Sequence, residues 1–124
     1  MHIFYCDDDQ DDIDFFSEVI QRIDSKIVLT IMKDPVEALE LLSTLKPLPH
    51  FIFFDCAMPK RDGLECVIAI KRNRSLKKIP LIMLSGGLDK SLIEKFNKLG
   101  VYMFVSKTNL EDLEKSLRSV FSLE

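Results

Sequence analysis

Short apolar runs alternate along this chain with segments whose apolar residues recur at helical spacing. Five runs have the length and the β-branched and aromatic content of buried strands. Each is followed by a stretch whose apolar positions recur every three or four residues, the stripe of an amphipathic helix. The predicted strands span residues 3–6, 27–32, 51–54, 79–84 and 101–105. The predicted helices cover residues 11–23, a segment from 35 to before Pro47, residues 62–74, a segment ending at Gly100, and a last segment from 108 to about 121.

Local signals predict where several helices begin and end. Asp34 has the position of an N-cap, and Pro35 follows it at the first helical position. Gly100 is suited to the left-handed residue that closes a helix. Thr108 and Glu111 have the spacing of a capping box, which predicts that the last helix opens at Thr108.

The order of these elements predicts the architecture. The runs at 51–54 and 79–84 are continuously apolar, which is typical of strands covered by helices on both faces. Strict alternation of strand and helix with right-handed crossovers gives a parallel sheet between two helical layers. The expected fold is therefore α/β and doubly wound. A length of 124 residues suits one domain, 1–124, and we expect no output domain.

Polar side chains gather where the predicted strands end. Asp7 and Asp8 follow the first strand, Asp55 ends the third, Ser85 follows the fourth and Lys107 follows the fifth. The carboxyl ends of parallel strands lie at one edge of the sheet, where ligands bind. We therefore expect several carboxylates, a hydroxyl and an ammonium group to share one cleft.

Such a cleft has a definite chemistry. Carboxylates a few ångströms apart repel one another unless a cation is present, and oxygen ligands suit a hard divalent ion such as Mg²⁺. Lys107 supplies a positive charge for an arriving phosphoryl group, and Ser85 supplies a hydrogen-bond donor. A carboxylate can be the nucleophile that forms an acyl phosphate. The pattern thus favours phosphoryl transfer to an aspartate.

Composition excludes other classes of function. The net charge of −3 argues against nucleic acid as a ligand, and no apolar stretch has the length of a membrane span. The first residues lack a signal peptide, which favours a cytoplasmic protein. Three cysteines without metal-ligand spacing are interpreted as reduced core residues, and the two histidines as surface or strand-start residues: Cys6, Cys56, Cys66, His2 and His50.

At four places the sequence resembles the receiver domains of two-component response regulators. The motifs are residues 5–9 (YCDDD), 53–63 (FFDCAMPKRDG), 80–86 (PLIMLSG) and 105–107 (VSK), and the resemblance covers the whole chain. The second motif is the most specific, because an apolar strand ending in D-x-x-M-P-x-x-D-G is hard to obtain by chance. The resemblance implies a flavodoxin-like (βα)5 fold with strand order 2-1-3-4-5.

The resemblance also implies roles for individual residues. Asp55 would be the phosphorylated residue. Mg²⁺ (or Mn²⁺) would be bound directly by Asp8 and Asp55, through water by Asp7, and by the backbone carbonyl of Ala57.

Further roles follow from the same resemblance. Ser85 and Lys107 would hold the phosphoryl oxygens. Phe104 stands where the family has an aromatic switch residue, and a buried core role is an equal alternative. The remaining acids of the first acidic run are interpreted as solvated residues near a helix N-terminus: Asp9, Asp11, Asp12 and Asp14.

The expected function is that of a single-domain response regulator. The phosphoryl donor would be a phosphohistidine of a sensor histidine kinase or a phosphotransfer protein. Output would be a phosphorylation-dependent interaction with a protein partner, through the face made by the fourth helix, fifth strand and fifth helix. Neither nucleic acid nor a membrane is an expected partner. Catalysis would be limited to the chain's own phosphorylation and dephosphorylation.

Three alternatives fit the pattern less well. A phosphatase of the haloacid dehalogenase type needs a second aspartate two positions after the nucleophile, where this chain has Ala57. A flavodoxin-like electron carrier needs a Ser/Thr-rich phosphate loop after the first strand, where this chain has acids. A degenerate receiver that never accepts phosphate is favoured only by Thr108, which replaces the proline that usually follows the family's lysine.

Overall fold

Five parallel strands form one sheet within residues 1–56, 63–86, 90–107 and 109–122, the part of the chain that this computed structural model describes. The strand order is β2-β1-β3-β4-β5, as the family resemblance implied. The elements are β1 (His2–Cys6), α1 (Gln10–Ile23), β2 (Val28–Met32), α2 (Pro35–Thr44), β3 (Phe51–Asp55), α3 (Gly63–Arg72), β4 (Leu81–Ser85), α4 (Lys90–Lys98), β5 (Met103–Ser106) and α5 (Leu110–Ser122).

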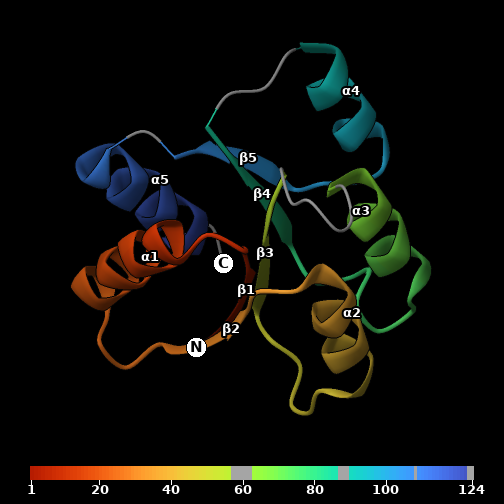
Figure 1. Ribbon diagram of the computed structural model, residues 1–124, viewed down its shortest axis with the longest axis horizontal. Helices are drawn as coiled ribbons and strands as arrows, with labels where there is room; N and C mark the ends of the chain where they lie inside the picture. Colours follow the sequence, from red (N-terminus) through yellow and green to blue (C-terminus); the bar gives the residue numbers. More distant parts are fainter. Residues whose placement is uncertain (57–62, 87–89, 108, 123–124) are drawn as a thin grey trace.

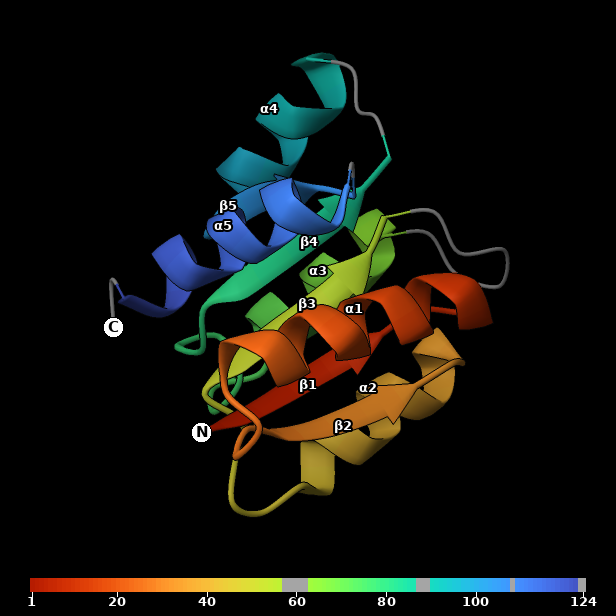
Figure 2. The ribbon, with the colours of Figure 1, turned by 90° about the vertical axis from the view of Figure 1, so that its left-hand side faces the viewer.

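Helices cover both faces of this sheet. Helices α1 and α5 lie side by side on one face, and α2, α3 and α4 lie on the other (Figures 1 and 2). Alternate side chains of each strand enter one of two apolar clusters, because successive residues of a strand point to opposite faces. In β3, for example, Phe54 joins the cluster under α2 and α3, whereas Phe53 joins the cluster under α1 and α5.

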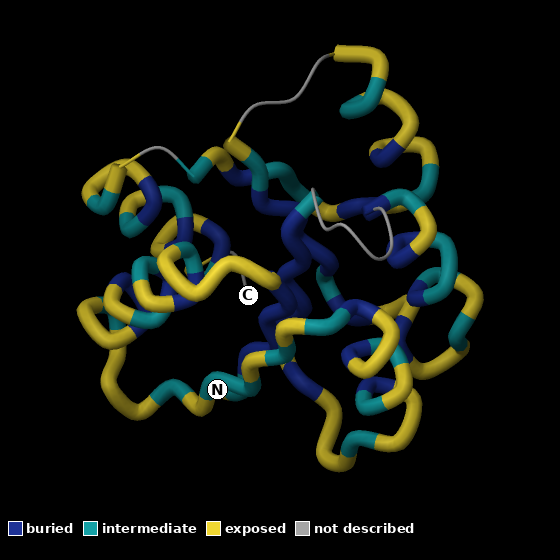
Figure 3. Tube along the Cα trace, in the orientation of Figure 1, coloured by how far each residue is buried: buried dark blue, intermediate teal, exposed yellow. Residues whose placement is uncertain are grey.

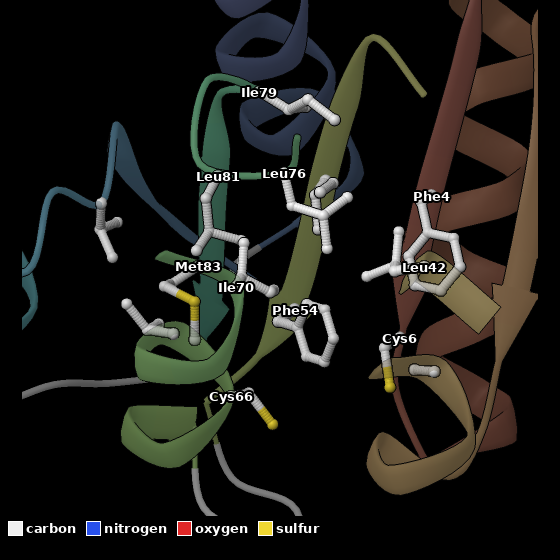
Figure 4. Packing of buried hydrophobic residues seen from close by; sticks show 14 of the residues in the cluster. Phe4, Cys6, Leu42, Phe54, Cys66, Ile70, Leu76, Ile79, Leu81 and Met83 are labelled. Carbon is white, nitrogen blue, oxygen red and sulfur yellow. The ribbon is translucent and has the colours of Figure 1, made fainter. Parts of the chain in front are cut away.

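The centre of the sheet is the most deeply buried part of the chain. Every residue of β3 is buried, which confirms the expectation of a strand covered on both faces (Figure 3). Figure 4 shows the cluster on the α2–α3 side, where Cys6 and Cys66 pack among aliphatic and aromatic side chains. Burial raises the pKa of the Cys6 thiol, so this thiol behaves as a small core residue. Cys56 is half-buried.

Two predicted helix boundaries are confirmed. Asp34 caps α2, because its Oδ1 accepts a hydrogen bond from the backbone N–H of Val36 at 2.8 Å. Gly100 follows α4 with a φ of +92°, the left-handed conformation that favours glycine.

The start of the last helix differs from the prediction. Asn109, not Thr108, caps α5, since the backbone N–H of Asp112 donates to Asn109 Oδ1 at 2.9 Å. The sequence contains two overlapping cap signals, and the second is used. Thr108 itself lies outside the described residues.

Three other boundaries are shifted by two residues. Strand β4 begins at Leu81 instead of Ile79, because Pro80 has no N–H to donate. Strand β5 begins at Met103 instead of residue 101, since Val101 still donates to Phe96 O at the end of α4. Helix α3 ends at Arg72, where the side chain of Asn73 begins a turn, and its predicted start at Asp62 lies outside the described residues.

The two histidines contact each other, which their separation in the sequence did not indicate. The backbone N–H of His2 donates to His50 Nδ1 at 3.0 Å, and the His2 ring is 2.8 Å from Thr30 Oγ1. Burial and the neighbouring His50 lower the pKa of His2. The pair joins the start of β1 to the start of β3.

Among the helices that the structure describes, we find none with the length and apolar character needed to traverse a bilayer.

Candidate functional site

Three aspartates meet at the carboxyl edge of the sheet. Strands β1 and β3 are neighbours with Cys6 opposite Phe54, so the residues that follow them come together. Carboxylate oxygens of Asp7, Asp8 and Asp55 all lie within 4.8 Å of one another. Asp7 is fully buried and Asp55 is 7% exposed, whereas Asp8 is exposed to solvent.

Lys107 enters this acidic group from the end of β5. Its Nζ lies 2.7 Å from Asp7 Oδ2 and 3.1 Å from Asp55 Oδ1. Burial by itself would lower the pKa of Lys107, but hydrogen bonds to Asp7 and Asp12 and the charge of Asp55 raise it above its usual value. The ammonium group therefore stays charged and offsets part of the repulsion between the carboxylates.

Asp12 also belongs to the site: it is a partly exposed acid in the first turn of α1, as interpreted, but its contact with Lys107 was missed. Lys107 Nζ donates to Asp12 Oδ2 at 2.9 Å. Helix α1 turns this residue toward the cleft, while Asp9 serves as the N-cap and accepts from the backbone N–H of Asp11. Nothing in the acidic run distinguishes Asp12 from its neighbours, because only the packing of α1 on the sheet selects the side that faces Lys107.

Tyr5 is a second residue that the sequence interpretation missed. Its hydroxyl donates to Asp7 Oδ2 at 2.6 Å in a buried position. Burial, this hydrogen bond and the nearby carboxylates raise the pKa of Tyr5, so the hydroxyl remains a donor. A signal was present, since Tyr5 is a polar-tipped residue in an apolar strand, two positions before Asp7 and thus on the same face.

The oxygens of Asp7 are held by protein donors. Oδ2 accepts from Tyr5 and Lys107, and Oδ1 accepts from the backbone N–H of Asp9 at 3.0 Å. Asp7 is therefore a fixed buried anion that positions Lys107.

Ser85 is linked to the site through the backbone. It is the last residue of β4 and lies opposite Ser106, and the backbone N–H of Lys107 donates to Ser85 O at 2.8 Å. The end of β4 is thus joined to the end of β5.

Two further predicted site residues remain. Phe104 is half-buried in β5, with its ring centroid 5.4 Å from that of Phe96 in α4. Ala57, the remaining predicted site residue, lies outside the described residues.

The comparison with known families decides what this arrangement is. The family model described as "Response regulator receiver domain" matches residues 3–118. The chain belongs to this family.

Similar receivers share both the sequence pattern and the fold. Response regulator Rcp1 of Synechocystis sp. is 29% identical over 97% of this chain and 86% of its own length. Hybrid signal transduction histidine kinase D of Dictyostelium discoideum is 29% identical over 94% of this chain, which spans 8% of that kinase. The phosphorylated cyanobacterial phytochrome response regulator RcpA superposes with a TM-score of 0.87 at 26% identity, covering 98% of this chain and 91% of RcpA.

Receiver domains bind Mg²⁺ or Mn²⁺ at the acidic pocket, and this receiver has the donor set for it. The structure of Mn²⁺-bound Rcp1 superposes with a TM-score of 0.84 at 28% identity, covering 98% of this chain and 91% of that chain. Among the described residues, the ammonium of Lys107 contacts the carboxylates of Asp7, Asp12 and Asp55, and Asp8 adds a fourth carboxylate beside Asp7 and Asp55. Excess negative charge and oxygen-only donors suit a hard divalent cation.

Membership of the family also gives the general activity and partners. Receiver domains are phosphorylated on an aspartate by kinases, and they interact with histidine kinases or phosphotransfer proteins. The convergence predicted for Asp7, Asp8, Asp55 and Lys107 is what the structure contains.

Replacing Tyr5 with phenylalanine tests the support of Asp7. The substitution removes a donor from a fully buried carboxylate oxygen, so we expect the free energy of unfolding to fall by about 1–2 kcal/mol. Urea unfolding of the metal-free protein measures it. Tyr102→Phe is the matched control, because the Tyr102 side chain is exposed and its substitution should change stability by less than about 0.5 kcal/mol. Equal stability of the Tyr5 variant and the wild type would contradict the proposed support.

Proposed function

We propose that this receiver accepts a phosphoryl group on Asp55. The observation that carries the proposal is the position of Asp55 at the tip of β3, with Oδ1 3.1 Å from Lys107 Nζ and inside the acidic group. Asp7 is less suited as the acceptor, since its side chain has no exposed surface and both of its oxygens accept protein hydrogen bonds. The side chain of Asp55 is 9% exposed, so an incoming phosphoryl donor has access to it.

The proposed reaction is a displacement at phosphorus. An oxygen of Asp55 attacks the phosphorus of a phosphohistidine on a histidine kinase or phosphotransfer protein. The new O–P bond forms as the P–N bond breaks, and the imidazole leaves and takes up a proton. Lys107 is placed to neutralise one phosphoryl oxygen, and the Ser85 hydroxyl is proposed to donate to another. Most of the catalysis is thus positioning and charge neutralisation.

The metal is proposed to be held by Asp8 and Asp55 directly and by Asp7 through water. The indirect role of Asp7 is supported by the donors that already occupy its oxygens. Asp8 is exposed and lies on the open side of the group. The Ala57 carbonyl remains a proposal from family resemblance. When bound, the divalent cation neutralises charge shared by the carboxylates and the phosphoryl oxygens.

Phosphorylation is proposed to act on β5 and its neighbours through Lys107. A phosphoryl group adds about −1.5 to −2 charges and competes with Asp7 and Asp12 for the ammonium group. The backbone hydrogen bond from Lys107 to Ser85 and the contact of Phe104 with Phe96 connect that change to β4 and α4.

Output is proposed to be an interaction of the α4–β5–α5 face with a protein partner. A pocket of about 300 Å³ on that face offers a place for a partner's side chain; it is lined by Met103, Phe104, Val105, Lys115, Ser116 and Ser119.

We propose no catalysis beyond the chain's own phosphorylation and dephosphorylation, since position 57 is alanine and not the acid–base aspartate of a phosphatase.

Acetyl phosphate and Mg²⁺ test the proposed acceptor. We expect intact-protein mass spectrometry to find a gain of one phosphoryl group in the wild type and no gain in Asp55→Asn. Asp14→Asn is the matched control, because Asp14 is an exposed acid of α1 outside the acidic group, and it should be labelled like the wild type. Labelling of Asp55→Asn would overturn the assignment, and steady turnover of a phosphate ester would favour a phosphatase.

A further inference from the structure

Strand β2 forms a free edge of the sheet that lacks the usual protection. Residues 27–32, Ile-Val-Leu-Thr-Ile-Met, contain no charge and no proline. Two apolar side chains of the strand reach the solvent, with Val28 60% exposed and Ile31 36% exposed. Natural edge strands are commonly guarded by charges, prolines or bulges, because unpaired edges template pairing with other chains. In Figure 2, β2 is drawn as the outer strand of the sheet next to β1, with α2 behind it.

The backbone groups on this edge are ready for another strand. Val28 N–H donates to Met1 O and Met32 O accepts from Asp7 N–H, so these two residues turn their backbone groups toward β1. Because the direction alternates along a strand, Leu29 and Ile31 direct their N–H and C=O groups away from β1, toward the side where the described chain places no further strand.

We infer that this edge pairs with the same edge of a second copy of the chain. A two-fold axis through Thr30 makes the pairing antiparallel and sets Leu29 opposite Ile31 of the partner copy, so that the outward backbone groups meet. The same register sets Val28 opposite Met32 of the partner copy. The two sheets then form one continuous sheet, with five strands from each copy.

The side chains of β2 suit pairing with β2 of a second copy better than pairing with an unrelated peptide. Within β2, every cross-strand pair is apolar or, at the axis, Thr30 with Thr30, and no like charges stand opposite each other. Beyond the strand ends, Ile27 of one copy comes level with Lys33 of the other, and Lys26 comes level with Asp34, the N-cap of α2. The symmetry repeats both pairs, of which the second joins opposite charges. The edge is therefore complementary to itself in hydrogen bonding, in apolar surface and in charge.

Sedimentation of the full chain from micromolar to millimolar concentration tests the assembly. We expect a monomer–dimer equilibrium that Ile31→Lys weakens by at least about tenfold, because it buries a charge opposite Leu29. Tyr102→Lys is the matched control: it also changes an exposed apolar residue to lysine, just before the opposite edge strand β5, and should dimerise like the wild type. A wild type that stays monomeric throughout, or a stronger effect of Tyr102→Lys than of Ile31→Lys, would overturn the inference.

A backbone variant separates edge pairing from misfolding. Ile31→Pro removes an N–H that points away from β1, so it should abolish the dimer and preserve the circular dichroism spectrum. If the Ile31→Pro variant unfolds, cysteine cross-linking of the otherwise unchanged chain tests whether the two β2 edges pair.

Cross-linking reports the register directly. Under mild oxidation Thr30→Cys should form an intermolecular disulfide, because residues facing each other at the axis have Cα atoms about 4.5 Å apart, within the disulfide range. Val28→Cys is more exposed, yet its two copies would lie roughly 13 Å apart along the strands and should not cross-link. Equal cross-linking of the two variants, or none for Thr30→Cys, would rule out this pairing.

Discussion

Lys107→Met is expected to lower the free energy of unfolding in metal-free buffer by about 3 kcal/mol, since removing one partner of a buried ion pair leaves the other uncompensated. The Lys107 side chain is 12% exposed and that of Asp7 is fully buried, so solvent screens their interaction weakly. The substitution would leave the carboxylates of Asp7, Asp12 and Asp55 without the ammonium group that contacts them. Saturating Mg²⁺ should restore part of the lost free energy of unfolding, because the bound cation replaces the missing positive charge.

Urea unfolding at neutral pH measures this loss in full. The pKa of Lys107 is raised above its usual 10.5, so its contribution is complete below that pH and declines only as the pH rises further. Lys115→Met is the matched control, since Lys115 is an exposed residue of α5 away from the acidic group. Equal stability of the Lys107 and Lys115 variants would contradict the structural role assigned to Lys107.

Mg²⁺ should stabilise the wild type by about 2.7 kcal/mol at a concentration one hundred times its dissociation constant, because it binds the folded state. Asp8→Asn should remove most of this gain while changing the metal-free protein little, since Asp8 is exposed and its charge adds to the repulsion in the acidic group. The two variants at the site thus have opposite effects on the stabilisation by Mg²⁺. Lys107→Met should increase the gain in free energy of unfolding that Mg²⁺ provides, and Asp8→Asn should decrease it.

Thermal unfolding over a Mg²⁺ titration, with EDTA as the starting point, measures this gain. Asp14→Asn should respond like the wild type, because Asp14 accepts a hydrogen bond from Gln10 on the exposed side of α1. A Mg²⁺ response that survives in Asp8→Asn but disappears in Asp14→Asn would place the cation outside the acidic group.

Contacts between residues near in sequence were predicted well. The cap at Asp34 and the closing glycine at position 100 depend on the backbone within a turn or two, so local residue types specify them. The buried run of β3 likewise follows from its own apolar residues. The errors among these local features were shifted element boundaries, for example at Thr108 and Asn109, where two cap signals overlap, and at the starts of β4 and β5.

By itself the sequence determined the alternation of elements and the placement of Asp7, Asp8, Asp55 and Lys107 at strand tips, because parallel strands bring their carboxyl ends to one edge whatever the details of packing. Only the tertiary structure decided that Asp12 joins Lys107 and that Tyr5 holds Asp7. The reason is geometric. These contacts depend on the rotation of α1 about its axis and on the depth of a side chain within the sheet, neither of which is specified by the spacing of residues along the chain.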